Sequence, residues 1–196
     1  MNGPAPPEAE AADDLAVLAA SRANPDRFVA LFDRYYPQIH RYARSRLGAE
    51  VADDVASETF LIAFRRRAEF DPGVGAGLVR SWLYGIATNL VHRHRRTEER
   101  RYRALARVPD MPDDPGHDER VVVRLSAELI RGELAAALAA LPARDRDVLL
   151  LMALGGLDHH EIAGTLDIPY GTVCSRLNRA RRKLRAALGV DPTEAD

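Results

Sequence analysis

A short basic stretch near the C-terminus carries residue types that can read nucleic-acid bases. Segment 172–188 holds five arginines and one lysine and no acidic residue, a net charge of +6. Arginine can grip guanine through two hydrogen bonds, and asparagine can do the same for adenine. The candidate contact residues are Cys174, Ser175, Arg176, Asn178, Arg179 and Arg182. Such side chains reach base edges near the start of a helix and phosphates further along it.

An apolar stripe predicts the helix that presents these side chains. Its members follow one another at intervals of three or four residues: Val173, Leu177, Ala180, Leu184 and Leu188. This spacing places them on one buried helix face. The candidate contact residues fall outside the stripe, so we expect them to face outward.

The residues before this helix predict the first half of a helix-turn-helix unit over 157–188. Asp158 can cap a short helix at its N-terminus, and Pro169 suits the first position of the next helix. The inner face of the short helix would hold Ile162, Ala163 and Leu166. Basic amphipathic helices also bind membranes or partner proteins. The turn and the apolar spacing favour DNA.

The charge of the chain is strongly segregated, although its total is only −1. Segment 80–107 carries eight arginines and two glutamates, a net charge of +6. Segment 108–119 carries five acidic residues and no lysine or arginine, a net charge of −5. Two basic patches separated by an acidic strip predict two contacts with a polyanion.

The composition is that of a folded protein of one medium or two small domains. Of the 196 residues, 46% are hydrophobic and 29% are charged. No apolar run approaches the roughly 18 residues of a membrane span. The N-terminus lacks the basic start and apolar stretch of a signal peptide. A single cysteine excludes an internal disulfide, so a reducing cytoplasm is the expected location.

Helical periods without strand-like alternation predict an all-α fold of two small domains joined by a flexible acidic linker. We expect a first domain over 25–107, a linker over 108–124 and a second domain over 125–189. The segments 1–24 and 190–196 are expected to be tails, the first of them disordered.

Within the first domain the pattern predicts three helices. The first begins at Pro25, is kinked or split by Pro37 and ends at Gly48. The second covers about 51–68. After a glycine-rich loop at 71–77, the third runs without a break through the basic segment that ends at Arg96.

Two motifs in order resemble those of bacterial sigma factors. "ADDVASETFLIAFRR", followed by a loop and "RSWLYGIATNLVHRHRR", is similar to region 2. "LPARDRDVLLLMALGGLDHHEIAGTLDIPYGTVCSRLNRARRKLRAAL" is similar to region 4. The chain resembles the sigma-70 family in its extracytoplasmic-function (ECF) form. The resemblance implies a protein that binds core RNA polymerase, directs it to promoters and helps to open the DNA.

The resemblance also implies the partner surfaces. The residues that match the family's contact with the β′ clamp are Asp54, Glu58, Thr59 and Phe60. Ser57 departs from the glutamine usual in the family. The residues placed to handle the minus-10 element are Arg80, Asn89, His92, Arg93, Arg95 and Arg96.

The basic C-terminal helix would read the minus-35 element. Cys174 stands where the family commonly has a basic residue. It is therefore either a neutral residue that faces DNA or a redox-active thiol. Further implied partners are the β flap of the polymerase and, in many members, an anti-sigma protein. The resemblance implies no catalytic residue, cofactor, metal or small-molecule substrate.

Two other classes of protein fit parts of the sequence. A response regulator shares the pattern of the last helices but needs a receiver domain of alternating strands and helices. A metal-dependent enzyme is suggested by "VHRH" and "DHHE", yet Gly164 stands where the zinc-protease pattern needs a second histidine. Both classes are therefore disfavoured.

Overall fold

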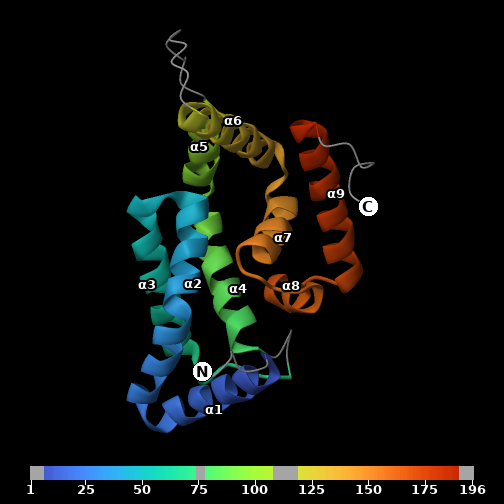
Figure 1. Ribbon diagram of the computed structural model, residues 1–196. Coiled ribbons are helices and arrows are strands. Elements are labelled where there is room, and N and C mark those ends of the chain that lie inside the picture. The colour runs from blue at the N-terminus through green and yellow to red at the C-terminus, as the bar shows by residue number, and fades with distance from the viewer. Residues whose placement is uncertain (1–6, 74–77, 108–118, 190–196) are drawn as a thin grey trace.

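A computed structural model describes residues 7–73, 78–107 and 119–189; for 7–12 and 119–129 only the course of the backbone is described. Within these ranges all regular structure is helical. The helices form two groups, α1 to α5 and α6 to α9, which lie side by side (Figure 1). We call them the first and the second module.

The first module is a bundle built around three long helices. Its elements are α1 (Pro7–Ala23), a 3-10 turn (Pro25–Phe28), α2 (Val29–Leu47), α3 (Ala49–Arg66), α4 (Val79–Arg93) and α5 (Arg95–Leu105). The helices α2, α3 and α4 pack together, and α1 crosses one end of them (Figure 1). The core contains fully buried Ile39, Tyr42, Ala43 and Ala87.

Gly48 ends α2, as the sequence predicts, and α3 begins directly after it at Ala49, earlier than the expected start near residue 51. At 97°, the φ of Gly48 lies in the region that glycine enters without steric strain. Pro37 lies inside α2 and does not split it, so that alternative is wrong. The expected third helix is two helices, because His94, at φ −95° and ψ 20°, leaves helical geometry between α4 and α5.

The N-terminal segment differs from its prediction as a disordered tail. Residues from Pro7 onward form α1, and Leu18 is only 1% exposed. The Asp14 carboxylate accepts hydrogen bonds from Arg34 and Tyr35 of α2. The acidic, alanine-rich start of the segment hid an apolar face formed by Leu15, Val17 and Leu18. Packing of that face orders the helix.

The second module contains α6 (Glu119–Ala140), α7 (Ala143–Ala153), α8 (His159–Leu166) and α9 (Tyr170–Leu188). Since α6 begins at Glu119, residues 119–124 are helical and not linker. The prolines end at Pro115, and an acidic residue in a first turn favours helix formation. The rest of the expected linker, 108–118, lies outside the described residues, as does the tail 190–196.

The helix-turn-helix is formed by α8 and α9, as predicted. The Asp158 side chain accepts a hydrogen bond from the Glu161 backbone N–H, and the Glu161 side chain accepts one from the Asp158 backbone N–H, both at 2.8 Å. This pair of bonds is a capping box. Asp167, at φ 50°, ends α8 in the left-handed region. In α9 the predicted stripe is buried at Val173, Leu177 and Ala180.

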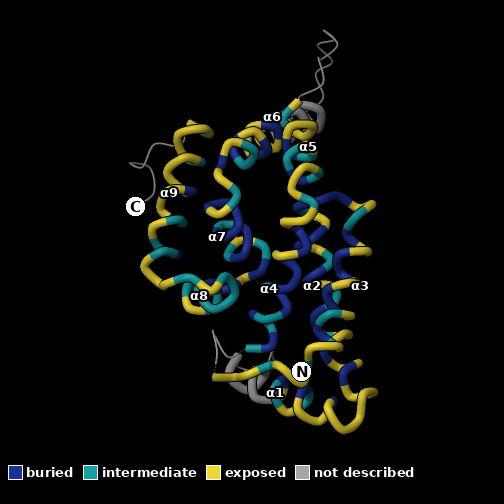
Figure 2. Tube along the Cα trace, turned by 180° about the vertical axis from the view of Figure 1, so that it is seen from behind, coloured by how far each residue is buried: buried dark blue, intermediate teal, exposed yellow. Residues whose placement is uncertain are grey.

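The two modules are in direct contact. Helix α8 packs against α4, and α6 packs against α5. Buried positions lie along the sides of α4 and α7 that face one another (Figure 2). At the α4–α8 contact, the Thr165 hydroxyl donates to the backbone carbonyl of Ser81 over 3.2 Å.

Candidate nucleic-acid interface

The predicted minus-35 residues lie along the outer side of α9. Ser175, Asn178 and Arg182 are exposed, whereas Cys174 and Arg176 are half-buried. Their outward position follows from burial of the apolar stripe against α6 and α7. This row offers an amide, a hydroxyl and guanidinium groups, which suit base edges and phosphates.

Arg179 also lies on α9 but already has a partner. Its Nη2 and Nε donate to the two carboxylate oxygens of Asp145 at 3.1 and 3.3 Å. Asp145 belongs to α7 and is 3% exposed. The carboxylate therefore holds the Arg179 guanidinium, from the middle of α9, beside the first turn of α7.

Five of the six predicted minus-10 residues fall on the last turns of α4 and the start of α5, whereas Arg80 lies in the first turn of α4. Asn89, Arg93, Arg95 and Arg96 are exposed. Arg93 forms an ion pair of 3.2 Å with Glu58, which the sequence assigned to the polymerase surface. Arg95 pairs more loosely with Glu99 one turn further along, at 3.5 Å.

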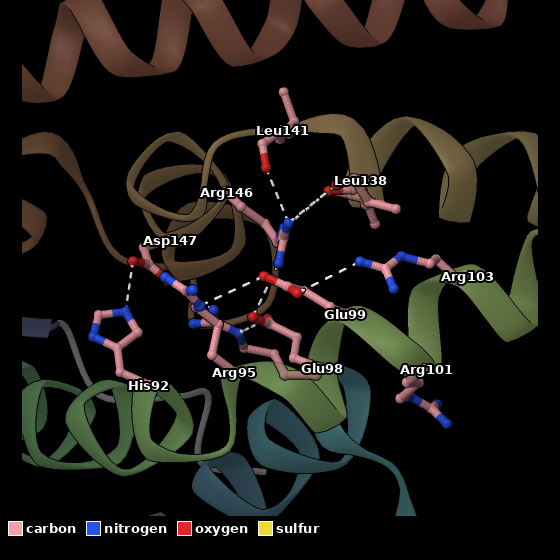
Figure 3. Close-up of polar contacts among 12 residues, drawn as sticks. His92, Arg95, Glu98, Glu99, Arg101, Arg103, Leu138, Leu141, Arg146 and Asp147 are labelled. Atoms are coloured by element: carbon pink, nitrogen blue, oxygen red, sulfur yellow. Dashed lines mark hydrogen bonds and ion pairs between the residues drawn. The ribbon is translucent and has the colours of Figure 1, made fainter.

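The other two predicted minus-10 residues contact the second module. Arg80 donates to the Gly155 carbonyl and lies 3.7 Å from Glu161. The His92 ring nitrogen Nε2 lies 2.8 Å from a carboxylate oxygen of Asp147 (Figure 3). Both side chains join α4 to the helix-turn-helix module.

A buried charge cluster joins the modules beside His92. Arg46 Nε donates to Glu98 at 2.6 Å, and Arg46 Nη2 donates to Asp147 at 2.7 Å. Arg146 Nη1 donates to the other Glu98 oxygen at 3.0 Å. These four side chains are 0–4% exposed. Two positive and two negative charges thus neutralise one another between α2, α5 and α7 (Figure 3).

Further hydrogen bonds satisfy the cluster. Arg146 also donates to the carbonyls of Leu138 and Leu141, both at 2.9 Å. Burial alone would raise the pKa of the Asp147 carboxyl. The hydrogen bond with His92 and the charge of Arg46 outweigh burial and hold this pKa below its ordinary value. The carboxylate is therefore the stable form at neutral pH.

Sequence reasoning missed all four cluster residues. One signal was present, because Arg46 occupies a position in the apolar period of α2, after Tyr42 and Ala43 and before Leu47. A charge at such a position indicates a buried partner. No local pattern marks Glu98 or Asp147, since their partner lies 52 and 101 residues away.

The residues predicted to bind the polymerase divide into two pairs. Asp54 and Glu58 are exposed on α3. Thr59 is 0% exposed and donates to the Val55 carbonyl at 2.7 Å. Phe60 is 4% exposed, with its ring centroid 5.0 Å from that of Phe32. In this structure Thr59 and Phe60 are therefore core residues of α3 that support the exposed surface without forming part of it.

Three exposed apolar side chains of α2 and α3 were not predicted as part of the polymerase surface. Val29, Phe32 and Leu61 are 56%, 39% and 47% exposed, respectively. They belong to α2 and α3, which also supply the core, so hydrophobicity alone did not distinguish them from buried residues.

The arrangement of two basic helical modules matches a known family in both halves. The family model for sigma-70 region 2 matches residues 31–101, and the model for sigma-70 region 4 matches residues 131–184. The chain belongs to the sigma-70 family. It shares 32% identity over 193 residues with the RNA polymerase sigma factor CnrH of Cupriavidus metallidurans, covering 93% of this chain and 97% of CnrH.

Other sigma factors place the chain in the ECF group. It is 34% identical to the ECF sigma factor SigL of Mycobacterium tuberculosis, over 88% of this chain and 94% of SigL. It is 32% identical to SigE of Mycolicibacterium smegmatis, of which it spans 60%. Initiation of transcription at specific promoters, with RNA polymerase, is thus the function of this sigma factor.

Solved sigma-factor structures share the fold. CnrH in complex with the cytosolic domain of CnrY matches with a TM-score of 0.63 and 26% identity, covering 91% of this chain and 98% of CnrH. RpoE of Bartonella quintana, in complex with the anti-sigma factor NepR, matches with a TM-score of 0.56 and 22% identity, covering 84% of this chain and 98% of RpoE.

The part of the chain that the structure describes lacks two further kinds of feature. No group of three or more histidine, cysteine, aspartate or glutamate residues there could hold a metal ion. Among the same residues, no helix combines the length and apolar character of a membrane span.

Proposed function

We propose that this sigma factor contacts promoter DNA through two separate basic surfaces. Helix α9 reads the minus-35 element, and the junction of α4 and α5 handles the minus-10 element. The observation that carries this assignment is that each surface joins an exposed asparagine to exposed arginines: Asn178 with Arg182, and Asn89 with Arg93 and Arg96. Asparagine supplies base recognition, and arginine holds phosphates or displaced bases.

Core polymerase binds the outer side of the first module in this proposal. Asp54 and Glu58 offer negative charge on α3, and Val29, Phe32 and Leu61 are exposed apolar side chains of α2 and α3. Such a surface suits a helical partner with basic and apolar side chains. The family resemblance makes that partner the β′ clamp. The same resemblance implies that the second module binds the β flap of the polymerase and that the complex lies in the cytoplasm.

An anti-sigma protein is a further proposed partner. The sigma factor RpoE of Bartonella quintana has been solved with the anti-sigma factor NepR. Its fold is shared by this chain, so a partner of the same class is proposed here too.

Transcription in vitro tests the polymerase surface and the minus-35 surface separately. With core polymerase and genomic DNA fragments, the wild-type chain should give promoter-directed transcripts. Glu58→Arg should impair holoenzyme formation through charge reversal, whereas Glu50→Arg, an exposed position on the same helix, should not. Normal holoenzyme formation by Glu58→Arg would refute this polymerase surface.

Arg182→Ala should form holoenzyme normally and bind minus-35 promoters about tenfold more weakly, because a side-chain contact with DNA is lost. The exposed Arg131 of α6 provides the matched control, Arg131→Ala. Equal promoter binding by both variants would count against α9 as the reading helix.

A further inference from the structure

The basic charge of the first module continues along α5 beyond the minus-10 surface. Three exposed arginines stand there at intervals of four and three residues: Arg96, Arg100 and Arg103. We call them the arginine stripe. We infer that the arginine stripe is a third DNA contact, which holds backbone phosphates of the duplex between the minus-10 and minus-35 elements. This inference rests on the proposed function, which uses only Arg96 of the stripe, and extends it to a further segment of DNA.

The spacing places the arginine stripe on one face of α5. An α-helix turns by about 100° per residue, so positions 96, 100 and 103 lie within about 60° of one another around the axis. The buried residues of α5, Glu98 and Tyr102, lie on the opposite face. Burial of that face against the rest of the protein turns the three arginines toward solvent.

The stripe lines an open groove that suits an anion. The groove has a volume of about 390 Å³ and is lined by Arg96, Glu99, Arg100 and Arg103. Glu99 is shared between Arg95 and Arg103, at the long distances of 3.5 and 3.6 Å. Three guanidinium groups therefore face one loosely held carboxylate, and the groove keeps a net positive charge.

Contacts within α5 do not account for the stripe. Like charges three or four residues apart destabilise a helix, and Arg100 stands at these distances from both Arg96 and Arg103. The helix dipole favours a cation in the last turn, which accounts for Arg103 alone. Arg100 makes only long bonds, of 3.3 Å to the Arg96 carbonyl and 3.5 Å to the Thr97 hydroxyl. Arg101, in contrast, donates to a main-chain carbonyl of α2. A mutually repulsive row of exposed cations indicates an external anion.

The residue types of the groove suit the backbone of duplex DNA. Arginine forms paired, charge-assisted bonds with phosphate. Base reading would use asparagine or glutamine, and a displaced strand would use aromatic rings for stacking; the residues that line the groove include neither. Arg96 and Arg103 are about 10 Å apart along the helix axis, which equals the rise of about three base pairs. The stripe can therefore follow a short run of phosphates.

The place of α5 in the fold selects the DNA between the two promoter elements. Arg96 belongs to the minus-10 surface, so the stripe begins there. At its other end α5 leads toward the second module, and it packs against α6 of that module (Figure 1). The second module carries the minus-35 helix. The spacer duplex joins the same two surfaces and is thus the DNA that α5 meets.

The salt dependence of promoter binding tests the stripe. Holoenzyme assembled with the full chain is titrated onto a promoter fragment recovered from the transcription experiment. The slope of log affinity against log salt concentration should become less steep by about one unit for Arg100→Ala and by about two for the double variant Arg100→Ala/Arg103→Ala, because each lost phosphate contact releases about one counterion fewer. Glu99→Gln should tighten binding at low salt, since it removes the anion from the groove. Arg131→Ala, at an exposed position of α6, is the charge-matched control and should leave the slope unchanged.

Uncharged DNA linkages locate the contact. Methylphosphonate linkages replace phosphates either in the spacer beside the minus-10 element or, as a control, upstream of the minus-35 element. The spacer replacement should weaken binding by the wild-type holoenzyme but should weaken binding by the double variant no further, because the same contact is already lost. Equal losses for wild type and double variant would place the contact elsewhere and overturn the inference. Loss of holoenzyme formation by the double variant would also overturn it, since the stripe would then bind polymerase.

The proposed function and the third contact fail in different ways. Absence of promoter-directed transcription with the wild-type chain overturns both. Promoter-directed transcription together with wild-type salt slopes for Arg100→Ala and the double variant overturns the third contact alone. Circular dichroism verifies that each variant keeps its helices, so that a changed slope reports DNA contact and not unfolding.

Discussion

Arg46 shows how one buried charge can matter more to the fold than many exposed ones. It is 0% exposed and donates to both Glu98 and Asp147, and its Nη1 lies 2.7 Å from the Tyr42 hydroxyl. Removal of this single cation leaves two carboxylates buried without their main partner. The exposed arginines of α9, in contrast, remain hydrated when a partner is lost.

Arg46→Ala should lower the free energy of unfolding by about 3–5 kcal/mol, the range for breaking a buried ion pair from one side. Urea denaturation followed by circular dichroism measures this change. Arg44→Ala, an exposed position on the same helix, should change stability by less than about 0.5 kcal/mol. Equal stabilities of the two variants would show that the cluster is not closed in solution.

The sequence predicts which residue types could bind partners, but it does not separate contact residues from core residues. Asp54 and Glu58 are exposed, whereas Thr59 and Phe60 from the same motif are buried. The four positions fit one resemblance equally well. Only packing against α2 distinguishes the two buried positions from the two exposed ones. This packing depends on side chains that are distant in the sequence.

Among the elements, those with local signals were predicted best. Asp158 and Glu161 stand three residues apart before an apolar stretch, and this pattern predicts the start of α8. Gly48 marks the turn between α2 and α3 in the same way. Helix α1 escaped prediction because its order depends on Asp14 and Leu18 packing against α2, a tertiary effect.

Asp158→Ala should destabilise the second module by about 1 kcal/mol, because the capped N–H group of Glu161 loses its acceptor. Thermal unfolding provides the measurement, with Asp33→Ala at an exposed position of α2 as the control. The midpoint should fall for Asp158→Ala and stay close to wild type for the control. The opposite order would contradict a stabilising capping box.

For the whole molecule, the two-module organisation could be predicted, but not the contact between the modules. Charge segregation and the two helical patterns indicate separate units. The cluster that joins them pairs residues as far as 101 positions apart, so no local period reveals it. Residues 108–118 between the modules suggested independence, whereas complementary charges on α2, α5 and α7 bring the units together.

The whole molecule should lose stability in alkali. Burial raises the pKa of Tyr84 and of Tyr102 to about 12, above the ordinary value of about 10. A raised pKa gives stability that is fully present below pH 10 and is lost as the pH rises through 12, because the unfolded chain releases these protons first. The thermal midpoint should therefore fall above pH 10.

Tyr84→Phe should flatten this fall, since its ring has no proton to lose, while Tyr170→Phe at an exposed position should leave the fall unchanged. Identical alkaline profiles for wild type and Tyr84→Phe would contradict a buried, neutral Tyr84. Absorbance of tyrosinate at each pH verifies which rings ionise.

Two hydrogen bonds between α4 and the second module have an evolutionary consequence. Arg80 and Thr165 both donate to main-chain carbonyls, those of Gly155 and Ser81. Every residue type carries such a carbonyl, so replacement of the acceptor residue's side chain requires no matching change in the donor. Correlated substitutions among homologues should thus reveal side-chain pairs such as Arg46 with Asp147 and Arg80 with Glu161, yet leave these two main-chain contacts without a signature.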